Sequence, residues 1–272
     1  MRRAAREARL EGRSIGFVPT MGYLHEAHLR LLDRAVAETD LSVMSVFVNP
    51  QQFGPREDYE KYPRDEPRDR ALARGRGCEI MFCPSAEHMY PAGFATSVRV
   101  KGLENKLCGI SRPGHFEGVC NVVLKLVNIV GPDRLYLGQK DAQQAFILEK
   151  MIRDLDLDVS VVVRPTVREP DGLAMSSRNV YLTEAQRAQA PVLFRALKSG
   201  ERAIRDGERT PLRVKKIMRR KFEDAPLARV EYLEAVDAAD LETPKRLGGR
   251  VLLAGAVWFG RTRLIDNVIV KL

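Results

Sequence analysis

Cysteine is scarce in this sequence: the 272 residues include four cysteines, at positions 78, 83, 108 and 120. No two of them form a C-x-x-C pair, and none lies near a histidine at the spacing of zinc ligands. The usual signatures of structural zinc and of dithiol redox chemistry are therefore missing. We expect reduced thiols in a cytoplasmic protein.

Long apolar runs are missing as well. No stretch approaches the ~18 apolar residues of a membrane-spanning helix. Residues 1–10 are charged and no apolar segment follows them, so they do not resemble a secretory signal. We expect no membrane partner.

Acidic residues are fewer than basic ones, 36 against 45, which gives a net charge of +9 at pH 7. This excess suits either nucleic acid or a small anionic substrate. The densest basic run, residues 213–221, has Val214, Ile217 and Met218 at helical spacing and no aromatic side chain. It is interpreted as the solvent-facing side of an amphipathic helix, and we expect no nucleic-acid partner.

The first part of the chain alternates strand-like apolar runs with helix-like segments. The strand-like runs lie at residues 15–18, 41–48, 79–83, 134–137 and 159–163, and the helix-like segments at 24–37, 119–130 and 140–155. This alternation predicts an α/β fold, with a parallel sheet and helices on both faces. Ligands of such sheets bind at the carboxyl ends of the strands.

The pattern changes near residue 167. Helix-like segments follow at 184–206 and 211–224, and alternating strand-like segments at 229–237, 251–259 and 263–270. Helices followed by strands predict a smaller α+β domain. We therefore expect two domains, residues 1–167 and 168–272.

The first polar turn follows the first predicted strand and has the sequence PTMGYLHEAH, residues 19–28. Met21 and Gly22 let the backbone approach a ligand, and the start of the next helix offers free N–H groups to phosphate. His25 and His28 are three apart, so we expect them on one helix face. Two imidazoles there suit the charge of a departing pyrophosphate. A structural pair or a metal site is the alternative.

The second polar turn, FVNPQQF at residues 47–53, follows the second predicted strand. Asn49 and Gln52 are uncharged hydrogen-bonding residues that suit hydroxyl and carboxylate groups. Asn-Pro is also a common way to end a strand. The polar residues 54–70 that follow are either a lid or an ordinary surface loop.

Three further turns carry polar groups. GQKDAQQ, residues 138–144, places Gly138, Lys140 and Asp141 at the start of a helix, with Gln144 one turn beyond Lys140. These residues suit phosphates with Mg²⁺, or only helix capping. AMSSRN, residues 174–179, suits a phosphate clamp or a helix start. For His115, in RPGHFEG at residues 112–118, we favour a structural role.

Six stretches in this order resemble the pantothenate synthetases, or pantoate–β-alanine ligases. They are PTMGYLHEAH, FVNPQQF, GPREDYEKYPR, RPGHFEGV, GQKDAQQ and DGLAMSSRN. The pairing of H-x-x-H with M-S-S-R is also similar to the signature of the wider nucleotidyltransferase superfamily. Each stretch is moderately specific, but six in register are highly specific.

The resemblance implies a Rossmann-like first domain, Mg²⁺ and ATP as cosubstrate, and a homodimer. It implies that the carboxylate of pantoate attacks the α-phosphate of ATP, giving pantoyl adenylate and pyrophosphate. The amine of β-alanine then displaces AMP to give pantothenate. The alternative is another nucleotidyltransferase with a phosphate acceptor, which would favour Lys or Arg where Gln52 and Gln144 stand.

The resemblance also assigns residues. The implied ATP contacts are Met21, Gly22, Tyr23, Leu24, His25, Glu26, Ala27, His28, Gly138, Gln139, Lys140, Asp141, Val167, Met175, Ser176, Ser177 and Arg178. Of these, His28, His25 and Lys140 are expected to act in catalysis. Gln52 and Gln144 fall where the family holds pantoate, and Asn49 joins them as a candidate substrate contact. Mg²⁺ is expected to bind mainly through ATP, without a protein metal site.

The chain departs from the family pattern in three places. Ala27 stands where members usually have glycine between the histidines, and its methyl group puts ATP affinity in question. Asn121 replaces a usual threonine, with no strong consequence expected. Members typically carry a strand and a helix before the segment that corresponds to residues 6–12.

Overall fold

The computed structural model describes residues 1–55 and 57–272. Arg56, in the stretch predicted as a lid or a surface loop, lies outside the described residues. The chain divides into two compact units. The first comprises Met1–Asn105, Gly109–Gln139 and Gln143–Pro165, and the second comprises Lys106–Cys108, Lys140–Ala142 and Thr166–Leu272.

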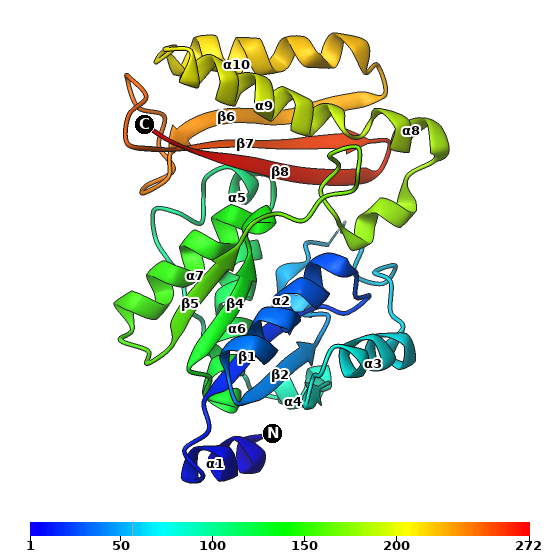
Figure 1. The fold of residues 1–272 in the computed structure, drawn as a ribbon, viewed down its shortest axis with the longest axis vertical. Helices are drawn as coiled ribbons and strands as arrows, with labels where there is room; N and C mark the ends of the chain where they lie inside the picture. Colours follow the sequence, from blue (N-terminus) through cyan, green and yellow to red (C-terminus); the bar gives the residue numbers. More distant parts are fainter. Residues whose placement is uncertain (56) are drawn as a thin grey trace. The chain divides into compact units, whose positions relative to one another are not determined.

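A five-stranded parallel sheet forms the centre of the first unit (Figure 1). Its strands are β1 (Ile15–Thr20), β2 (Leu41–Val46), β3 (Ile80–Phe82), β4 (Arg134–Gly138) and β5 (Ser160–Arg164). They are ordered β3-β2-β1-β4-β5, so the direction of winding reverses between β1 and β4. In open sheets of this kind, ligands bind outside the carboxyl ends of the strands at such a switch point.

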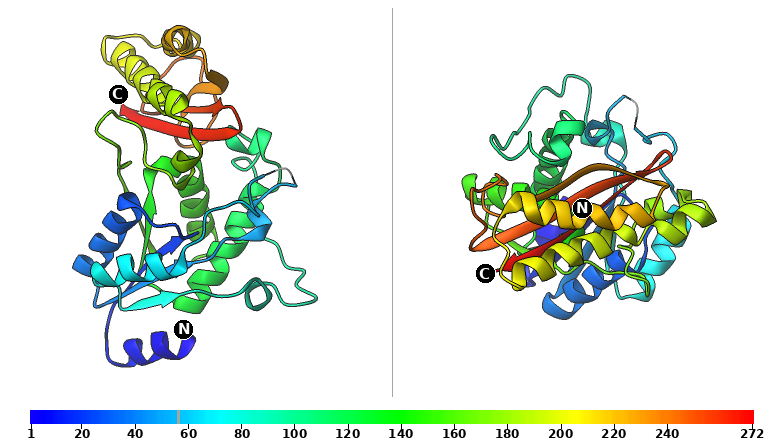
Figure 2. Two further views of the ribbon diagram at one scale, coloured as in Figure 1. Left: turned by 90° about the vertical axis from the view of Figure 1, so that its right-hand side faces the viewer. Right: turned by 90° about the horizontal axis from the view of Figure 1, so that it is seen from above.

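Seven helices and two 3₁₀ turns lie among the described residues from Met1 to Asp154. They are α1 (Arg2–Leu10), α2 (Glu26–Glu38), α3 (Glu66–Gly75), α4 (Ala86–Met89), α5 (Cys108–Ser111), α6 (His115–Val130) and α7 (Ala142–Asp154), with the 3₁₀ turns η1 (Pro50–Gln52) and η2 (Gln139–Asp141). Helices α2 and α6 lie on opposite faces of the sheet (Figure 2). The predicted fold class, a parallel sheet covered by helices, is confirmed.

One row of side chains across the sheet faces α2. Val18 is paired in register with Met44, and both are fully buried together with Tyr136. They pack against Leu32 and Ala35 of α2, neither of which is exposed to solvent. The continuous apolar runs of the sequence reflect this burial of the strands on both faces.

The predicted loop at residues 54–70 is only partly a loop. Helix α3 already begins at Glu66, because the carboxylate of Asp65 accepts a hydrogen bond from the Arg68 backbone N–H at 3.1 Å. Pro67 stands in the first turn, where its missing N–H costs nothing. The residues that end the predicted loop therefore belong to a helix.

The second unit contains a three-stranded antiparallel sheet in the order β6-β7-β8. Its elements are η3 (Ser177–Tyr181), α8 (Glu184–Gln189), α9 (Val192–Arg205), α10 (Pro211–Arg220), η4 (Lys221–Asp224), β6 (Ala228–Asp237), β7 (Arg250–Phe259) and β8 (Thr262–Lys271). The single helix predicted over residues 184–206 is wrong: it is divided into α8 and α9 at Pro191, which lacks the N–H that would continue the helix.

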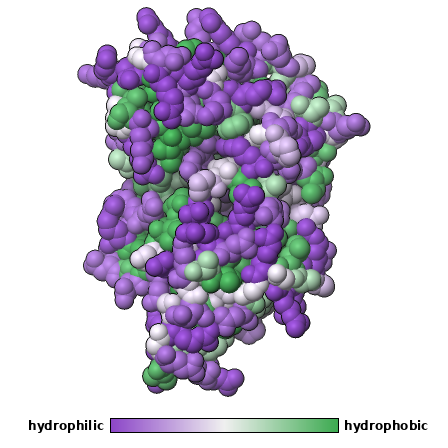
Figure 3. Space-filling view, in the orientation of Figure 1, coloured by the Kyte–Doolittle hydropathy of each residue, from purple (hydrophilic) through white to green (hydrophobic). Residues whose placement is uncertain are grey.

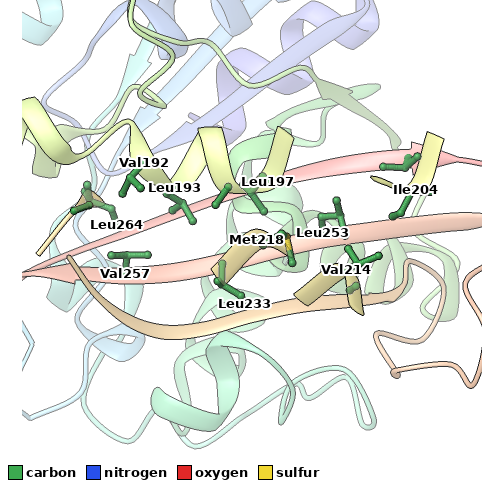
Figure 4. Close-up of a cluster of buried hydrophobic side chains, with 14 of the residues drawn as sticks. Val192, Leu193, Leu197, Ile204, Val214, Met218, Leu233, Leu253, Val257 and Leu264 are labelled. Carbon is green, nitrogen blue, oxygen red and sulfur yellow. The ribbon is translucent and has the colours of Figure 1, made fainter. Parts of the chain in front are cut away.

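Helices α9 and α10 cover one face of this sheet (Figure 1). Leu197 and Val214 of these helices belong to the same core as Leu253 and Val257 of β7, and all four side chains are fully buried (Figure 4). The basic residues of α10 lie away from this core, and the surface over α10 is mainly hydrophilic (Figure 3). The amphipathic-helix interpretation of the basic run is confirmed.

None of the four cysteines forms a disulfide. Across the part of the chain that the structure describes, every helix is too short or too polar to cross a membrane.

Candidate active site

The turn after β1 has an unusual backbone. Gly22 has a φ of +82° and Tyr23 a φ of +51°, so two consecutive residues adopt the left-handed conformation. A Cβ on Gly22 would lie 2.8 Å from Cγ1 of Val46. Both the dihedral angle and the close approach therefore require glycine at this position.

Asp69 of α3 anchors this turn. Its Oδ2 accepts a hydrogen bond from the Tyr23 backbone N–H at 2.6 Å, and its Oδ1 accepts one from the Leu24 N–H at 2.7 Å. The preceding N–H, of Gly22, donates to Thr20 Oγ1 at 3.2 Å. One buried carboxylate thus holds two successive amides. Asp69 was not predicted as a site residue, although its place four residues from the buried Ala73 puts a carboxylate on the inner face of α3.

Burial raises the pKa of Asp69 above its usual value, and the two backbone N–H groups oppose this rise. Only 1% of the residue is exposed. The two hydrogen bonds therefore offset part of the desolvation cost of the ionised carboxylate.

The two histidines of the turn lie together, but not on one helix face. His25 is the N-cap of α2, with extended backbone, and only His28 lies within the helix. Their rings stack with centroids 4.0 Å apart and planes inclined by 25°. The prediction of a shared helix face is wrong because His25 precedes the first helical turn, although the capping geometry still brings the rings together.

The His25 backbone N–H donates a long hydrogen bond of 3.4 Å to Nδ1 of His28. An imidazole nitrogen that accepts such a bond carries no proton, so the neutral ring of His28 carries its proton on Nε2. His28 therefore offers an N–H donor at the start of a helix, where the backbone also favours anions.

The turn after β2 brings Gln52 to this first turn. The Nε2 of Gln52 lies 2.8 Å from Sδ of Met21, and Gln52 is only 8% exposed. Asn49 is even more deeply buried and donates through Nδ2 to Oε1 of Gln52 at 3.2 Å. The structure thus joins two of the predicted motifs.

Arg112 and His115, at the start of α6, hold the backbone of the same turn. Nδ1 of His115 lies 2.8 Å from the backbone oxygen of Gln52, and Nη1 of Arg112 lies 3.0 Å from Nε2 of His115. Because a guanidinium only donates, Nε2 of His115 accepts and Nδ1 donates. Arg112 also forms an ion pair with Glu57, with Nε to Oε1 at 2.8 Å. The side chain of His115 thus supports this loop by donating a hydrogen bond to the backbone carbonyl of Gln52.

The chain after β4 carries the motif GQKDAQQ, residues 138–144. A Cβ on Gly138 would meet no atom within 4 Å, so this position is open space. Gln144 is half-buried on the first turn of α7. Gly138, Gln139 and Gln144 belong to the first unit, whereas Lys140 and Asp141 belong to the second.

Within the second unit, Lys140 lies beside the M-S-S-R segment. The carbonyl of Lys140 accepts a hydrogen bond from Nδ2 of Asn267 on β8 at 2.9 Å. Lys140 and Ser176 line a small cavity together with apolar residues that include Phe194 and Leu264.

The M-S-S-R segment is fixed by its own backbone. Oγ of Ser176 accepts from the Arg178 N–H at 3.3 Å, which starts the 3₁₀ turn η3. The Met175 N–H donates to the carbonyl of Val167 at 3.0 Å. This hydrogen bond brings the backbone of Val167 next to the motif.

Asp266, which also lines this cavity, belongs to a buried ion pair. Arg168 donates to Asp266 through both Nη atoms, at 2.6 and 3.0 Å, and its guanidinium lies 3.7 Å from the ring centroid of Phe194. Burial raises the pKa of Asp266, and the bonds from Arg168 oppose the rise. Sequence reasoning missed both residues because they are 98 positions apart.

Asp141 is the carboxylate nearest to Lys140, with Oδ2 at 3.6 Å from Nζ. No group of three or more His, Cys, Asp or Glu side chains at metal-binding distance occurs among residues 1–55 and 57–272. A Mg²⁺ ion that is held by nucleotide phosphates uses only one or two protein carboxylates, and Asp141 fits that arrangement.

Comparison with known proteins identifies the family. The family model for pantoate–β-alanine ligase matches residues 1–269. This chain belongs to the pantoate–β-alanine ligase family. The pantothenate synthetase of Moorella thermoacetica is 54% identical over 264 residues, covering 97% of this chain and 93% of that protein. That of Thermodesulfovibrio yellowstonii is 51% identical, covering 100% of this chain and 97% of that protein.

Solved structures of family members are similar to this one over nearly the whole chain. The pantothenate synthetase of Thermus thermophilus superposes with a TM-score of 0.92 at 45% identity, covering 97% of this chain and 96% of that chain. The pantoate–β-alanine ligase of Francisella tularensis, complexed with β-γ ATP and β-alanine, gives a TM-score of 0.80 at 33% identity, covering 98% and 93%. The two-sheet architecture described above is thus the architecture of the family.

Proposed function

We propose that this chain catalyses the ATP-dependent condensation of pantoate with β-alanine to give pantothenate, AMP and pyrophosphate. The observation that carries the proposal is the match of the family model to residues 1–269, with the predicted motifs at the carboxyl ends of β1, β2 and β4. In the homologue from Francisella tularensis, ATP and β-alanine are the bound molecules.

The reaction has two steps. A carboxylate oxygen of pantoate attacks the α-phosphorus of ATP, and the bond to the bridging oxygen breaks, so that pyrophosphate leaves with the electron pair. The amine of β-alanine then attacks the carbonyl carbon of the pantoyl adenylate. AMP leaves with the electrons of the C–O bond, and the amine loses a proton. Both steps need charge stabilisation and positioning, without a covalent enzyme intermediate.

Nucleotide contacts are proposed in each unit. In the first unit they are Met21, Gly22, Tyr23, Leu24, His25, Glu26, Ala27, His28, Gly138 and Gln139, and in the second Lys140, Asp141, Val167, Met175, Ser176, Ser177 and Arg178. The Nε2–H of His28 is a donor for charge that develops on pyrophosphate, with His25 stacked beside it. Lys140 supplies a full positive charge for the phosphates.

Pantoate is proposed to bind at Gln52 and Gln144, and Asn49, the third candidate, is hydrogen-bonded to Gln52. The side-chain N–H of Gln52 donates to the thioether sulfur of Met21, which is a weak acceptor. An oxygen of the substrate is a stronger acceptor and would replace the sulfur. Neutral amides recognise hydroxyl and carboxylate oxygens without competing for the phosphates.

Three further properties are proposed from the resemblance. Mg²⁺ enters as the complex with ATP, and Asp141 is the carboxylate placed to meet it. The enzyme works as a homodimer. It works in the cytoplasm, in keeping with four cysteines that form no disulfide.

The test is an assay of the two half-reactions. The purified chain is given Mg²⁺, ATP and pantoate, with and without β-alanine, while pyrophosphate exchange and AMP release are followed. We expect exchange that depends on pantoate, and multiple-turnover release of AMP only when β-alanine is present. Lys140→Ala is expected to lower the exchange rate by about 10²-fold. Pyrophosphate exchange that does not depend on pantoate would refute this function and indicate a different acceptor.

A further inference from the structure

The side chain of Asn49 has no hydrogen-bonding capacity left for a ligand. Its Oδ1 accepts from the Gln51 backbone N–H at 3.2 Å and from the hydroxyl of Tyr90 at 2.8 Å. Its Nδ2 donates to the carbonyl of Gly118 at 3.0 Å and to Oε1 of Gln52 at 3.2 Å. A carboxamide has two acceptor and two donor positions, and all four are used here. Asn49 is also only 1% exposed.

The orientation of this carboxamide follows from its backbone partners. The Gln51 N–H can only donate and the Gly118 carbonyl can only accept, so they fix which end of Asn49 is oxygen and which is nitrogen. The end of Gln52 that meets Nδ2 of Asn49 must then be its oxygen. The N–H end of Gln52 consequently points to Met21.

The close approach that allows this chain of bonds depends on glycine. A Cβ on Gly118 would lie 2.2 Å from the carbonyl oxygen of Gln51 and 2.8 Å from the backbone nitrogen of Gln52. The absence of a side chain on Gly118 therefore lets the first turn of α6 pack directly on η1. This contact brings the Gly118 carbonyl within reach of Asn49.

Tyr90 supplies the remaining donor from the C-terminal end of α4. Its ring packs edge-on against Phe94, with centroids 5.2 Å apart, and is tilted against Phe47 at 6.3 Å. Burial raises the pKa of Tyr90 far above its usual value, so its hydroxyl keeps the proton. The hydroxyl can then donate to the oxygen of Asn49 throughout the physiological pH range.

We propose that Asn49 and Tyr90 are positioning residues of pantoate binding, which together orient the Gln52 carboxamide so that its N–H, and not its oxygen, meets the substrate. This inference rests on the proposed function, because it concerns the same pantoate site. Asn49 then acts through Gln52 and makes no contact with substrate itself.

The test compares two conservative tyrosine variants in the pyrophosphate-exchange assay. Tyr90→Phe removes one of the two donors to Asn49 and leaves the ring packing intact. We expect the KM for pantoate to rise about 3- to 10-fold, while the KM for ATP and kcat stay close to the wild-type values. Tyr136→Phe is the matched control, because that buried hydroxyl donates to Glu38 at 2.9 Å, on the α2 face of the sheet. We expect it to leave both KM values unchanged.

A second variant, at Asn49, is designed to reverse the orientation of the Gln52 carboxamide. Asn49→Asp replaces the Nδ2 donor by an oxygen of nearly the same shape, so Gln52 must turn its N–H towards the new carboxylate and its oxygen towards the substrate. We expect a rise in pantoate KM larger than that of Tyr90→Phe, of about 10²-fold. If this variant does not fold, the comparison of Tyr90→Phe with Tyr136→Phe tests the positioning role by itself.

The outcomes separate the two proposals. A wild-type chain without pantoate-dependent exchange refutes the proposed function itself. Wild-type exchange with equal pantoate KM values for Tyr90→Phe and Tyr136→Phe overturns the positioning role and leaves the function standing. A rise in ATP KM as large as the rise in pantoate KM also overturns it, because a general loosening of the site would affect both substrates.

Discussion

The turns after β1 and β2 lie beside each other, but they are held by different chemistry. The turn after β1 contains two left-handed residues, and the buried carboxylate of Asp69 anchors two of its amides. The turn after β2 is anchored by the neutral groups of Asn49 and Tyr90. The charged anchor acts on backbone that is proposed to meet phosphates, and the neutral anchor acts on a side chain that is proposed to meet pantoate.

This difference separates two requirements. Backbone N–H groups that surround an anion must be held rigidly, and an ionised acceptor makes stronger hydrogen bonds than a neutral one. Recognition of a hydroxyl instead needs the correct polarity of one carboxamide, for which neutral donors and acceptors of fixed direction are sufficient. Perturbing each turn in isolation should therefore affect different kinetic constants.

The largest effect is expected from His28→Ala in the first turn. The variant loses the N–H donor proposed for pyrophosphate, so adenylation should slow by about 10²-fold or more, with little change in pantoate KM. Single-turnover formation of pyrophosphate measures this step. His88→Ala is the control, because His88 is an exposed histidine bonded to Ser85 at 2.8 Å. A wild-type rate in His28→Ala would remove His28 from the catalytic set.

Asp69→Asn tests the charged anchor. A carboxamide has a single oxygen, so one of the Tyr23 and Leu24 amides would face an NH₂ group. We expect the rate of adenylation to fall by about 10- to 100-fold, in line with one unsatisfied buried donor. Asp65→Asn is the control on the same helix, because aspartate and asparagine are nearly equivalent at an N-cap. Equal rates for the two variants would contradict the anchoring role.

Gln52→Ala tests the second turn directly. Loss of the N–H donor should raise the pantoate KM by about 10-fold, with the ATP KM unchanged. Gln51→Ala in the same 3₁₀ turn should leave the pantoate KM near that of the wild type, because Gln51 is exposed and its side chain bonds to Asn121 at 3.2 Å. Steady-state exchange kinetics measure both. An unaltered pantoate KM in Gln52→Ala would remove this residue from the proposed substrate contacts.

The smallest effect concerns pH. Because burial raises the pKa of Asp69 in the folded state, the native protein keeps this proton more tightly than the unfolded chain does. The wild-type free energy of unfolding, relative to that of Asp69→Asn, should therefore fall as pH rises from the usual aspartate value of 3.8 to the higher native value. Above that interval the difference should be constant. Urea denaturation of both proteins across this range measures it, and a difference that grows with pH would contradict the account.

The sheet and the motifs were predictable from the sequence because their signals are local. The buried strands are continuous apolar runs, and the polar turns PTMGYLHEAH, FVNPQQF and GQKDAQQ lie directly at strand ends. The helix boundaries that depend on caps were less accurate: α3 begins at Glu66 through the Asp65 cap, and Pro191 divides a predicted helix into α8 and α9.

The anchors of the site were not predictable because each acts on a distant segment. Asp69 is 46 positions from Tyr23, Tyr90 is 41 positions from Asn49, and Gly118 is 69 positions from Asn49. None of these residues belongs to a pattern that indicates its partner. The prediction that Asn49 and Gln52 act in the same turn needed only their spacing, whereas the direction of the Gln52 carboxamide needed the three-dimensional network.

Adenylation of a carboxylate is the central claim, and an isotope experiment tests it most directly. Pantoate labelled with ¹⁸O in its carboxylate is incubated with the chain, Mg²⁺, ATP and β-alanine, and the products are analysed by mass spectrometry. Attack on the α-phosphorus predicts that one labelled oxygen appears in AMP and that pyrophosphate stays unlabelled. Label in orthophosphate, with ADP as the nucleotide product, would show attack on the γ-phosphorus and contradict the account.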